Sequence, residues 1–302
     1  MSAMRRLAAA FALCCLTLGV NAQGVQGSVE REVPSLILFG AFTHGGVWQG
    51  DAAILELEQQ LGRELDIIHW YQNWDTDWDE ELVASVAYER RIPMISWQSR
   101  DRSVRDIAAG MYDDYIRSWA RGVSDFHRPV YMRPFPEMNG DWTDWNGDPE
   151  GLVRAWIRIT AIFREEGAHN AFWVWSPNVT DDPRTEANRM EHYFPGPAYV
   201  DVLALDGFNW GTTRESGWRS AEEVFRTGYD RIAALARRPI WFAEIGSTDE
   251  GGDKAQWVRD LLLNAYSWFP RLTAIVWFDE DKETDWRIAS SADVVRMFRL
   301  LP

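Results

Sequence analysis

Two glutamates, Glu137 and Glu244, each follow a short apolar run of the kind that forms a buried strand. Glu137 lies in Arg-Pro-Phe-Pro-Glu-Met-Asn-Gly-Asp-Trp, and Glu244 lies in Ile-Trp-Phe-Ala-Glu-Ile-Gly. Hydrolysis of a glycosidic bond with retention requires two carboxyl groups, one as general acid and base and one as nucleophile. The pair therefore predicts glycosidase chemistry, and the alternative is two ordinary surface or ion-paired glutamates.

The separation of the two glutamates fits a repeating fold. They are 107 residues apart, which is three units of an eight-unit barrel with about 35 residues per strand and helix. This places them at the carboxyl ends of strands four and seven, where barrel enzymes carry their catalytic groups. A neighbouring carboxylate and an apolar wall of Phe135 and Trp142 would help Glu137 to hold its proton.

Polar residues close to Glu137 are further candidates for the site. Arg133 precedes Glu137 by four residues on the same strand, and we expect it to keep the nucleophile ionised. A buried ion pair that supports the barrel is the alternative for Arg133. Asn139 is predicted to hydrogen bond to sugar or to shape the turn with Gly140.

The chain contains 18 tryptophans, an unusually high number, and several lie where strands end. Sugar rings stack their C–H faces on aromatic planes, and their hydroxyls bond to indole N–H and amide groups. Tryptophans at helical positions, such as Trp119 and Trp257, are expected in the core. The predicted substrate-binding residues are Trp97, Arg133, Asn139, Trp142, Trp145, Asn209, Trp210 and Trp277.

Eight apolar runs alternate with amphipathic stretches. The runs are 36–42, 65–71, 92–97, 129–135, 171–176, 200–208, 239–245 and 272–278. The helix-like stretches are 51–61, 79–90, 104–119, 149–166, 220–236 and 254–268, with a short polar helix expected in 181–193. Continuous apolar strands that alternate with helices indicate an α/β fold, a single-domain (β/α)8 TIM barrel. An open doubly wound sheet is the alternative, but no Gly-x-Gly-x-x-Gly follows the first strand.

The first 22 residues read as a signal peptide. Arg5 and Arg6 precede an apolar stretch over 7–20, and cleavage after Ala22 leaves a catalytic domain over 23–302. Both cysteines, Cys14 and Cys15, lie in this segment, so the mature domain has no thiol chemistry. The protein is therefore expected to be secreted, to the periplasm or the extracellular space, as a monomer without membrane insertion.

Composition excludes several other classes of function. The net charge is -15 with a pI of about 4.8, which disfavours nucleic acid and anionic lipid as partners. The five histidines lack metal-ligand spacing, and no Gly-x-Ser-x-Gly elbow marks a serine hydrolase. No metal or cofactor is expected, and the expected partner is a polysaccharide substrate.

At these residues the chain resembles glycoside hydrolase family 26, in the clan of barrel glycosidases. The segments that carry the resemblance are 107–113, 133–145, 199–201, 206–210, 243–246 and 285–288. The resemblance implies a retaining endo-β-glycanase without a cofactor, with Glu137 as acid/base and Glu244 as nucleophile. It also implies that Trp142 and Trp277 line the subsite where the bond breaks. Most members hydrolyse β-1,4-mannan, whereas others hydrolyse mixed-linkage β-glucan or β-1,3-xylan.

Two residues depart from the family pattern. Pro136 stands where relatives usually have the histidine that organises the sugar subsite. Phe208 stands where relatives often have a tyrosine whose hydroxyl reaches the nucleophile. Mannan is the first substrate expectation, with β-glucan, β-1,3-xylan or an exopolysaccharide as alternatives within the class. A carbohydrate-binding protein with weakened catalysis is the rival from another class, and the retention of both glutamates argues against it.

Overall fold

In the computed structural model, eight parallel strands close into a single barrel in chain order. The structure describes residues 37–48, 50–88 and 90–299. The predicted signal peptide and the start of the predicted domain lie outside these residues. The strands are β1 Leu38–Thr43, β2 Ile67–Asn73, β3 Ile92–Gln98, β4 Val130–Pro134, β5 Ala171–Trp175, β6 Val202–Asn209, β7 Ile240–Ser247 and β8 Leu272–Asp279. All six residues of β1 are in register with Ala274–Asp279 of β8, which closes the ring. The predicted barrel is confirmed, and the open sheet is excluded.

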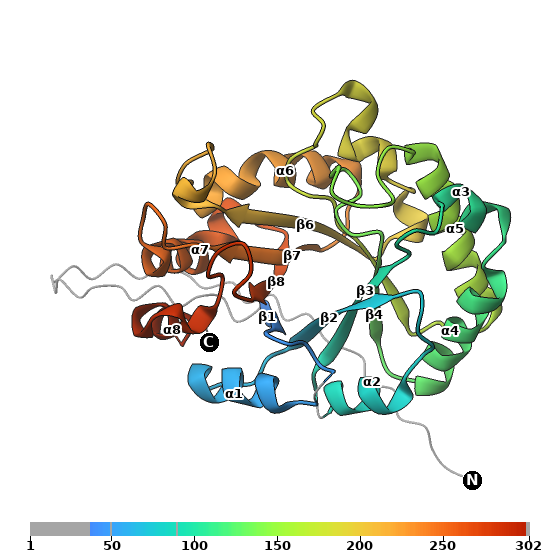
Figure 1. Ribbon diagram of the computed structural model, residues 1–302, viewed down its shortest axis with the longest axis horizontal. Coiled ribbons are helices and arrows are strands. Elements are labelled where there is room, and N and C mark those ends of the chain that lie inside the picture. The colour runs from blue at the N-terminus through green and yellow to red at the C-terminus, as the bar shows by residue number, and fades with distance from the viewer. Residues whose placement is uncertain (1–36, 49, 89, 300–302) are drawn as a thin grey trace, which may run out of the picture. The chain divides into compact units, whose positions relative to one another are not determined.

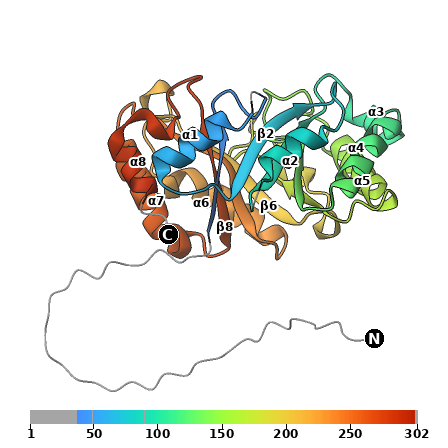
Figure 2. The same cartoon turned by 90° about the horizontal axis from the view of Figure 1, so that it is seen from below.

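Helices surround the barrel on its outside (Figure 1, and from below in Figure 2). They are α1 Ala52–Leu61, α2 Glu80–Val86, α3 Val104–Ala109, α4 Asp113–Phe126, α5 Pro149–Glu165, α6 Ala221–Leu235, α7 Lys254–Trp268 and α8 Ala292–Phe298. The polar stretch after β5 forms the 3-10 turns Glu186–Asn188 and Met190–Tyr193 in place of the expected short α-helix. Five of the described helices have an aspartate or serine N-cap that accepts a backbone N–H three residues later, and Ser220 forms a full capping box with Glu223.

The helix expected over 104–119 is two helices, because Gly110 ends the first one. Gly110 has φ 94°, a left-handed conformation that closes α3 by bonding back to the carbonyls of Asp106 and Ile107. A Cβ at this position would lie 2.3 Å from the Nη2 atom of Arg158. The chain then restarts as α4 and continues to Phe126, seven residues beyond the expected end.

Two apolar cores lie on the two faces of the sheet. The larger core fills the space between strands and helices, and it includes Trp97, Phe242, Ile275 and Trp277. The smaller core fills the barrel interior and consists of Ile67, Met94, Val174, Val202, Ala204, Trp241, Ala243, Ala274 and Val276. Because strand residues alternate between faces, each strand divides its side chains between these cores. The interior core ends below the carboxyl ends of the strands, where polar residues replace the apolar ones.

Candidate active site

Glu137 lies in a tight loop three residues after the end of β4. Phe135 and Glu137 both have left-handed backbone conformations, with φ values of 52° and 54°. Non-glycine residues rarely adopt this conformation, and it typically persists where surrounding contacts enforce it. The Glu137 N–H donates to the Ser176 carbonyl at 2.8 Å, and the Glu137 carbonyl accepts from the Gly140 N–H at 2.8 Å. The loop therefore fixes the direction of the Glu137 side chain.

Two side chains donate hydrogen bonds to the Glu137 carboxyl group. The Nε1 atom of Trp142 donates to Oε2 at 2.9 Å, and the Nδ2 atom of Asn178 donates to Oε1 at 2.6 Å. Burial and the negative charge of Glu244 raise the pKa of Glu137, whereas the two hydrogen bonds and Arg133 oppose the rise. A carboxyl group with a raised pKa can hold a proton and release it to a leaving group, as a general acid must.

Glu244 points into the barrel because β7 contains a bulge. Leu205 of β6 is in register with Phe242, and the next residue, Asp206, is in register with Glu244, so Ala243 is an extra residue. Ala243 belongs to the interior core, and without the bulge the next side chain would face the helices. The bulge therefore redirects the Glu244 carboxylate to the barrel mouth.

A buried polar network anchors Glu244. The Nη1 atom of Arg133 donates to the Oε2 atom of Glu244 at 2.8 Å and to the Ser96 hydroxyl at 2.8 Å. The Nη2 atom of the same arginine is paired with Asp206, and the side chains of Arg133 and Asp206 are fully buried. Burial lowers the pKa of Arg133, but the charges of Asp206 and Glu244 outweigh it, so the pKa lies above its ordinary value. The arginine therefore stays charged beside Glu244, where the sequence predicts it. The buried ion pair that was the alternative role for Arg133 is formed as well, with Asp206.

Tyr71 of β2 lines the same part of the barrel mouth as Glu244. Its ring packs edge-on against Phe42 and His69, with centroid distances of 5.1 and 4.7 Å. Burial raises the pKa of the Tyr71 phenol well above its ordinary value, and the charge of Glu244 and hydrogen bonding to it add to the rise. Tyr71 is therefore a neutral phenol close to the Glu244 carboxylate.

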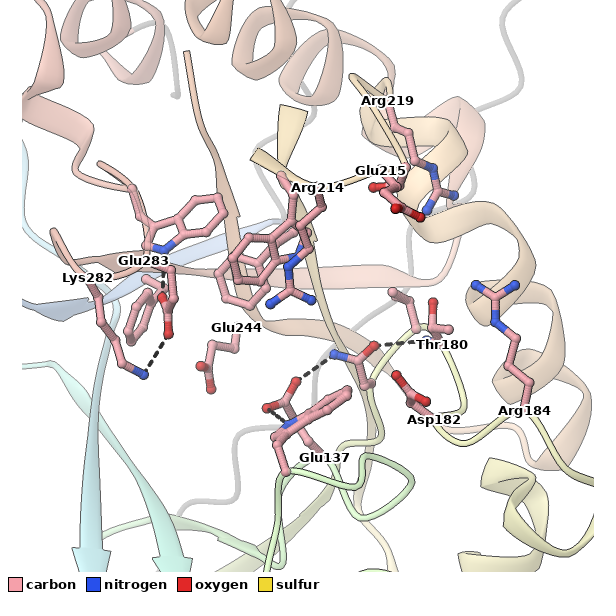
Figure 3. Close-up of a pocket in the computed structure, with 18 residues that line it drawn as sticks. Glu137, Thr180, Asp182, Arg184, Arg214, Glu215, Arg219, Glu244, Lys282 and Glu283 are labelled. Atoms are coloured by element: carbon pink, nitrogen blue, oxygen red, sulfur yellow. Dashed lines mark hydrogen bonds and ion pairs between the residues drawn. The ribbon is translucent and has the colours of Figure 1, made fainter. Parts of the chain in front are cut away.

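A cleft crosses the barrel mouth and passes over both glutamates. It has two parts of about 780 and 690 Å³. The parts share Glu137, Trp142, Glu244 and Lys282, so the glutamates lie where they meet. Figure 3 shows the two carboxylates facing the same space in the larger part. A chain of sugars can therefore extend beyond the glutamates in both directions.

The structure brings only some of the predicted substrate-binding residues to the cleft. Trp142 and Trp145 line its smaller part, and Trp142 and Trp210 line its larger part. The indole of Trp145 is held by a 2.9 Å hydrogen bond to the Pro136 carbonyl. Arg133 is fully buried beneath the cleft and acts on the site through Glu244.

Trp97 and Trp277 do not reach the cleft, contrary to the prediction. Both are buried in the helix-facing core, where Trp97 packs against Trp119 and Trp277 packs against Trp257 and Phe298. The reason is strand alternation, because Ser96 and Phe278, one position away, occupy the inner face. The aromatic wall of the cleft is instead formed by Phe208, Trp210, Phe278 and Trp286.

Asn139 and Asn209 are also fully buried and hold loops rather than lining the cleft. Asn139 bonds to the backbone N–H and carbonyl of Asn178, at 2.8 and 2.9 Å, and thereby positions the amide that reaches Glu137. Asn209 donates to Ser247 and accepts the N–H groups of Gly211 and Arg219. For Asn139 the turn-shaping alternative is the one that the structure supports.

Sequence reasoning missed Tyr71 and Asn178, which both lie beside a glutamate. Each follows or ends one of the eight apolar runs, and that position was the available signal. Asp206 was seen only within a family-like segment, and its pairing with Arg133 was not anticipated. Among the residues that the structure describes, no group of three or more His, Cys, Asp or Glu is arranged to hold a metal ion.

Comparison with known proteins identifies the family. Residues 91–247, just over half of the chain, match the family Glycosyl hydrolase family 26. The chain belongs to this family. The resemblance inferred from its motifs is thus confirmed, and the matched segment contains both Glu137 and Glu244.

Two proteins with known names are similar to parts of this chain. Endoglucanase H of Acetivibrio thermocellus is 35% identical over 269 residues, which are 84% of this chain and 30% of that protein. A mannan endo-1,4-beta-mannosidase of Bacillus subtilis is 27% identical over 164 residues, which are 50% of this chain and 40% of that protein. This chain therefore spans less than half of the length of either relative.

A solved structure of a family 26 enzyme has the same fold. A modular endo-beta-1,4-mannanase from Cellulomonas fimi superimposes with a TM-score of 0.67 at 16% identity, covering 88% of this chain and 70% of that one. At this identity the likeness concerns the barrel alone. In the described part of the chain, no helix combines the length and apolar character that crossing a membrane requires.

Proposed function

We propose that this family 26 chain is a retaining, endo-acting β-glycan hydrolase in which Glu137 is the acid/base and Glu244 the nucleophile. The observation that carries the proposal is the pairing of two carboxylates with opposite surroundings at one barrel mouth. Glu137 has a raised pKa, which suits a proton donor. Glu244 accepts a hydrogen bond from a buried arginine, which suits a carboxylate that must stay ionised.

The reaction then has two steps. In the first, a Glu244 oxygen attacks the anomeric carbon while Glu137 gives its proton to the glycosidic oxygen, and the leaving sugar departs. In the second, Glu137 takes a proton from water, which attacks the same carbon and releases Glu244. Arg133 orients Glu244, while Trp142 and Asn178 orient Glu137. The cleft continues past the glutamates on both sides, which supports cleavage within a chain rather than at its end.

For the substrate we propose a β-glucan rather than mannan, the first expectation from the sequence. An endoglucanase is the relative that matches 84% of this chain, whereas the mannosidase matches half of it. Pro136 supports a departure from the family's commonest substrate, because a proline ring cannot form the hydrogen bond with which a histidine would organise the sugar subsite. Mannan and β-1,3-xylan remain outcomes of the test.

A pair of variants tests the two catalytic roles. A glycoside with a strongly acidic phenol as leaving group needs no proton in the first step. Glu137→Ala should therefore still release the phenol in a first turnover, while losing activity on a polysaccharide by about 10²–10⁴-fold. Glu244→Ala should fail on both substrates. Loss of phenol release in both variants, or in neither, would refute the assignment of roles.

A substrate panel tests the choice of β-glucan. Mixed-linkage β-glucan, glucomannan, galactomannan and β-1,3-xylan are incubated with the protein and with Glu244→Ala, and reducing ends are counted. Release from mixed-linkage β-glucan alone supports the proposal. Release from a mannan only would restore the first expectation. Binding without release by either protein would favour the rival reading of a carbohydrate-binding protein.

A further inference from the structure

The two parts of the cleft differ in the side chains that meet the substrate. The smaller part, here the amide arm, presents Gln72, Asn73 and Gln98 at the ends of β2 and β3, and Arg100, which also lines it, donates to the Asn73 side chain at 2.9 Å. The larger part, here the arginine arm, presents Arg184, Arg214 and Arg219 from the loops after β5 and β6. Amides suit the neutral hydroxyls of a sugar, whereas guanidinium groups suit carboxylates or other anions.

The arginines of the arginine arm lack ion-pair partners. Within the described part of the chain, neither Arg184, Arg214 nor Arg219 forms an ion pair, although Asp182 and Glu215 line the same arm. The chain as a whole carries a net charge of -15, so acidic partners are abundant. By contrast, Lys282 at the junction is paired with Glu283 at 2.9 Å. Arg219 donates to the backbone carbonyl of Glu223, so Arg184 and Arg214 are the two whose charges are left available to a ligand.

Arg214 is held in a defined position. Its guanidinium carbon lies 3.5 Å from the centre of the Trp210 ring, so the flat cation is stacked on the indole. Stacking occupies one face of the guanidinium and leaves its N–H edge available for a bidentate contact. Figure 3 shows Arg214 between the two glutamates and the other two arginines. Asn209 ties both ends of the segment that carries Arg214, through the N–H groups of Gly211 and Arg219.

We propose that the arginine arm binds an anionic group of the substrate, such as the carboxylate of a uronic acid unit, while the amide arm binds neutral sugars. The inference rests on the proposed function and narrows its substrate to an acidic β-glycan. Arg214 and Arg184 are the specificity-determining residues, because they carry charge into the cleft without a protein partner.

Binding of a matched pair of polymers tests this inference. The probes are mixed-linkage β-glucan and the same polymer with part of its primary hydroxyls oxidised to carboxylates. The protein is the full chain carrying Glu244→Gln, which prevents turnover, and the readout is the Kd at low and high salt. The oxidised polymer should bind about tenfold or more tightly than the neutral one at low salt, and the difference should shrink at high salt.

Two double variants separate the arm from the overall charge. Arg184→Gln/Arg214→Gln should abolish the preference for the oxidised polymer and keep the circular dichroism spectrum of the parent. Arg237→Gln/Arg259→Gln makes the same charge change at exposed arginines that do not line the cleft, and it should keep the preference. Equal binding of the two polymers, or equal loss in both double variants, would overturn the inference. Reducing-end release from neutral β-glucan by the parent chain tells whether the proposed function survives that result.

Discussion

Ala243 and Glu244 are neighbours in β7, yet both side chains face the inside of the barrel. Ala243 packs in the interior core, and Glu244 receives a hydrogen bond from Arg133 at the barrel mouth. The bulge that makes this possible sets Asp206 beside Glu244 in register. One arginine, Arg133, therefore contacts both carboxylates.

Removal of the Tyr71 hydroxyl should slow the reaction more than it weakens binding. Tyr71→Phe keeps the ring packed against Phe42 and His69 but removes a hydroxyl that can donate to Glu244 in the part of the cleft that both residues line. A hydrogen bond to a charged group contributes about 1.5–3 kcal/mol, so kcat should fall by roughly 10- to 100-fold with little change in KM. Tyr131→Phe, in the lower barrel against Phe172 and Trp241, is the control and should leave kcat unchanged. A rise in KM alone would assign Tyr71 to sugar binding instead.

Arg133→Met should unfold more easily and lose activity. The substitution leaves Asp206 buried without its cation, and breaking such a pair costs about 3–5 kcal/mol. Urea unfolding measures the loss. Arg226→Met breaks half-exposed pairs with Glu222 and Asp230 on α6 and removes a cation from the Phe269 ring, and it should cost only about 1 kcal/mol. Similar losses in both variants would mean that the buried network contributes little to stability.

The alkaline limit of activity should move up when Glu137 loses a donor. In the proposed mechanism activity requires protonated Glu137, and the hydrogen bond from Trp142 lowers the pKa of Glu137 by favouring the ionised form. Trp142→Phe removes that donor, so the pKa of Glu137 rises and the alkaline limb of kcat/KM shifts to higher pH. Asn178→Ala should shift it in the same direction. Trp48→Phe changes an exposed tryptophan in the amide arm and should leave the alkaline limb of kcat/KM unchanged. If the limb stays in place in all three variants, it does not report the titration of Glu137.

Comparing Gly110 with Gly147 separates the two ways in which an alanine after α3 would lower the free energy of unfolding, backbone strain and a steric clash. Gly147 and Gly110 both have left-handed φ values, 87° and 94°, but only Gly110 faces a close neighbour, Arg158. Gly147→Ala should cost about 1–2 kcal/mol, from the backbone alone. Gly110→Ala should cost more, because its Cβ displaces Arg158 from its two 2.6 Å contacts with Asp113. Thermal or urea unfolding compares the two, and an equal cost would show that Arg158 moves freely.

The sequence by itself determined the barrel and the two glutamates. Eight continuous apolar runs need cover on both faces, and a closed parallel sheet with outer helices provides it, so the pattern specifies the fold. The glutamates were recognisable because each breaks an apolar run at the end where barrel sites form. The family assignment followed from short segments that include both residues.

Only the tertiary structure decided which side chains meet the substrate. Trp97 and Trp277 were assigned to the cleft, but an alternating strand places each of them on the helix side, one residue away from an inner position. Alternation alone would also place Glu244 outside the barrel, since its neighbour Ala243 faces the interior. The bulge that turns Glu244 inward is set by pairing with β6 and β8 rather than by local sequence. Tyr71, Asn178 and the unpaired arginines come from separate strands and loops. These side chains come together only because the barrel closes, and a local pattern of residues carries no information about the distances between separate strands and loops.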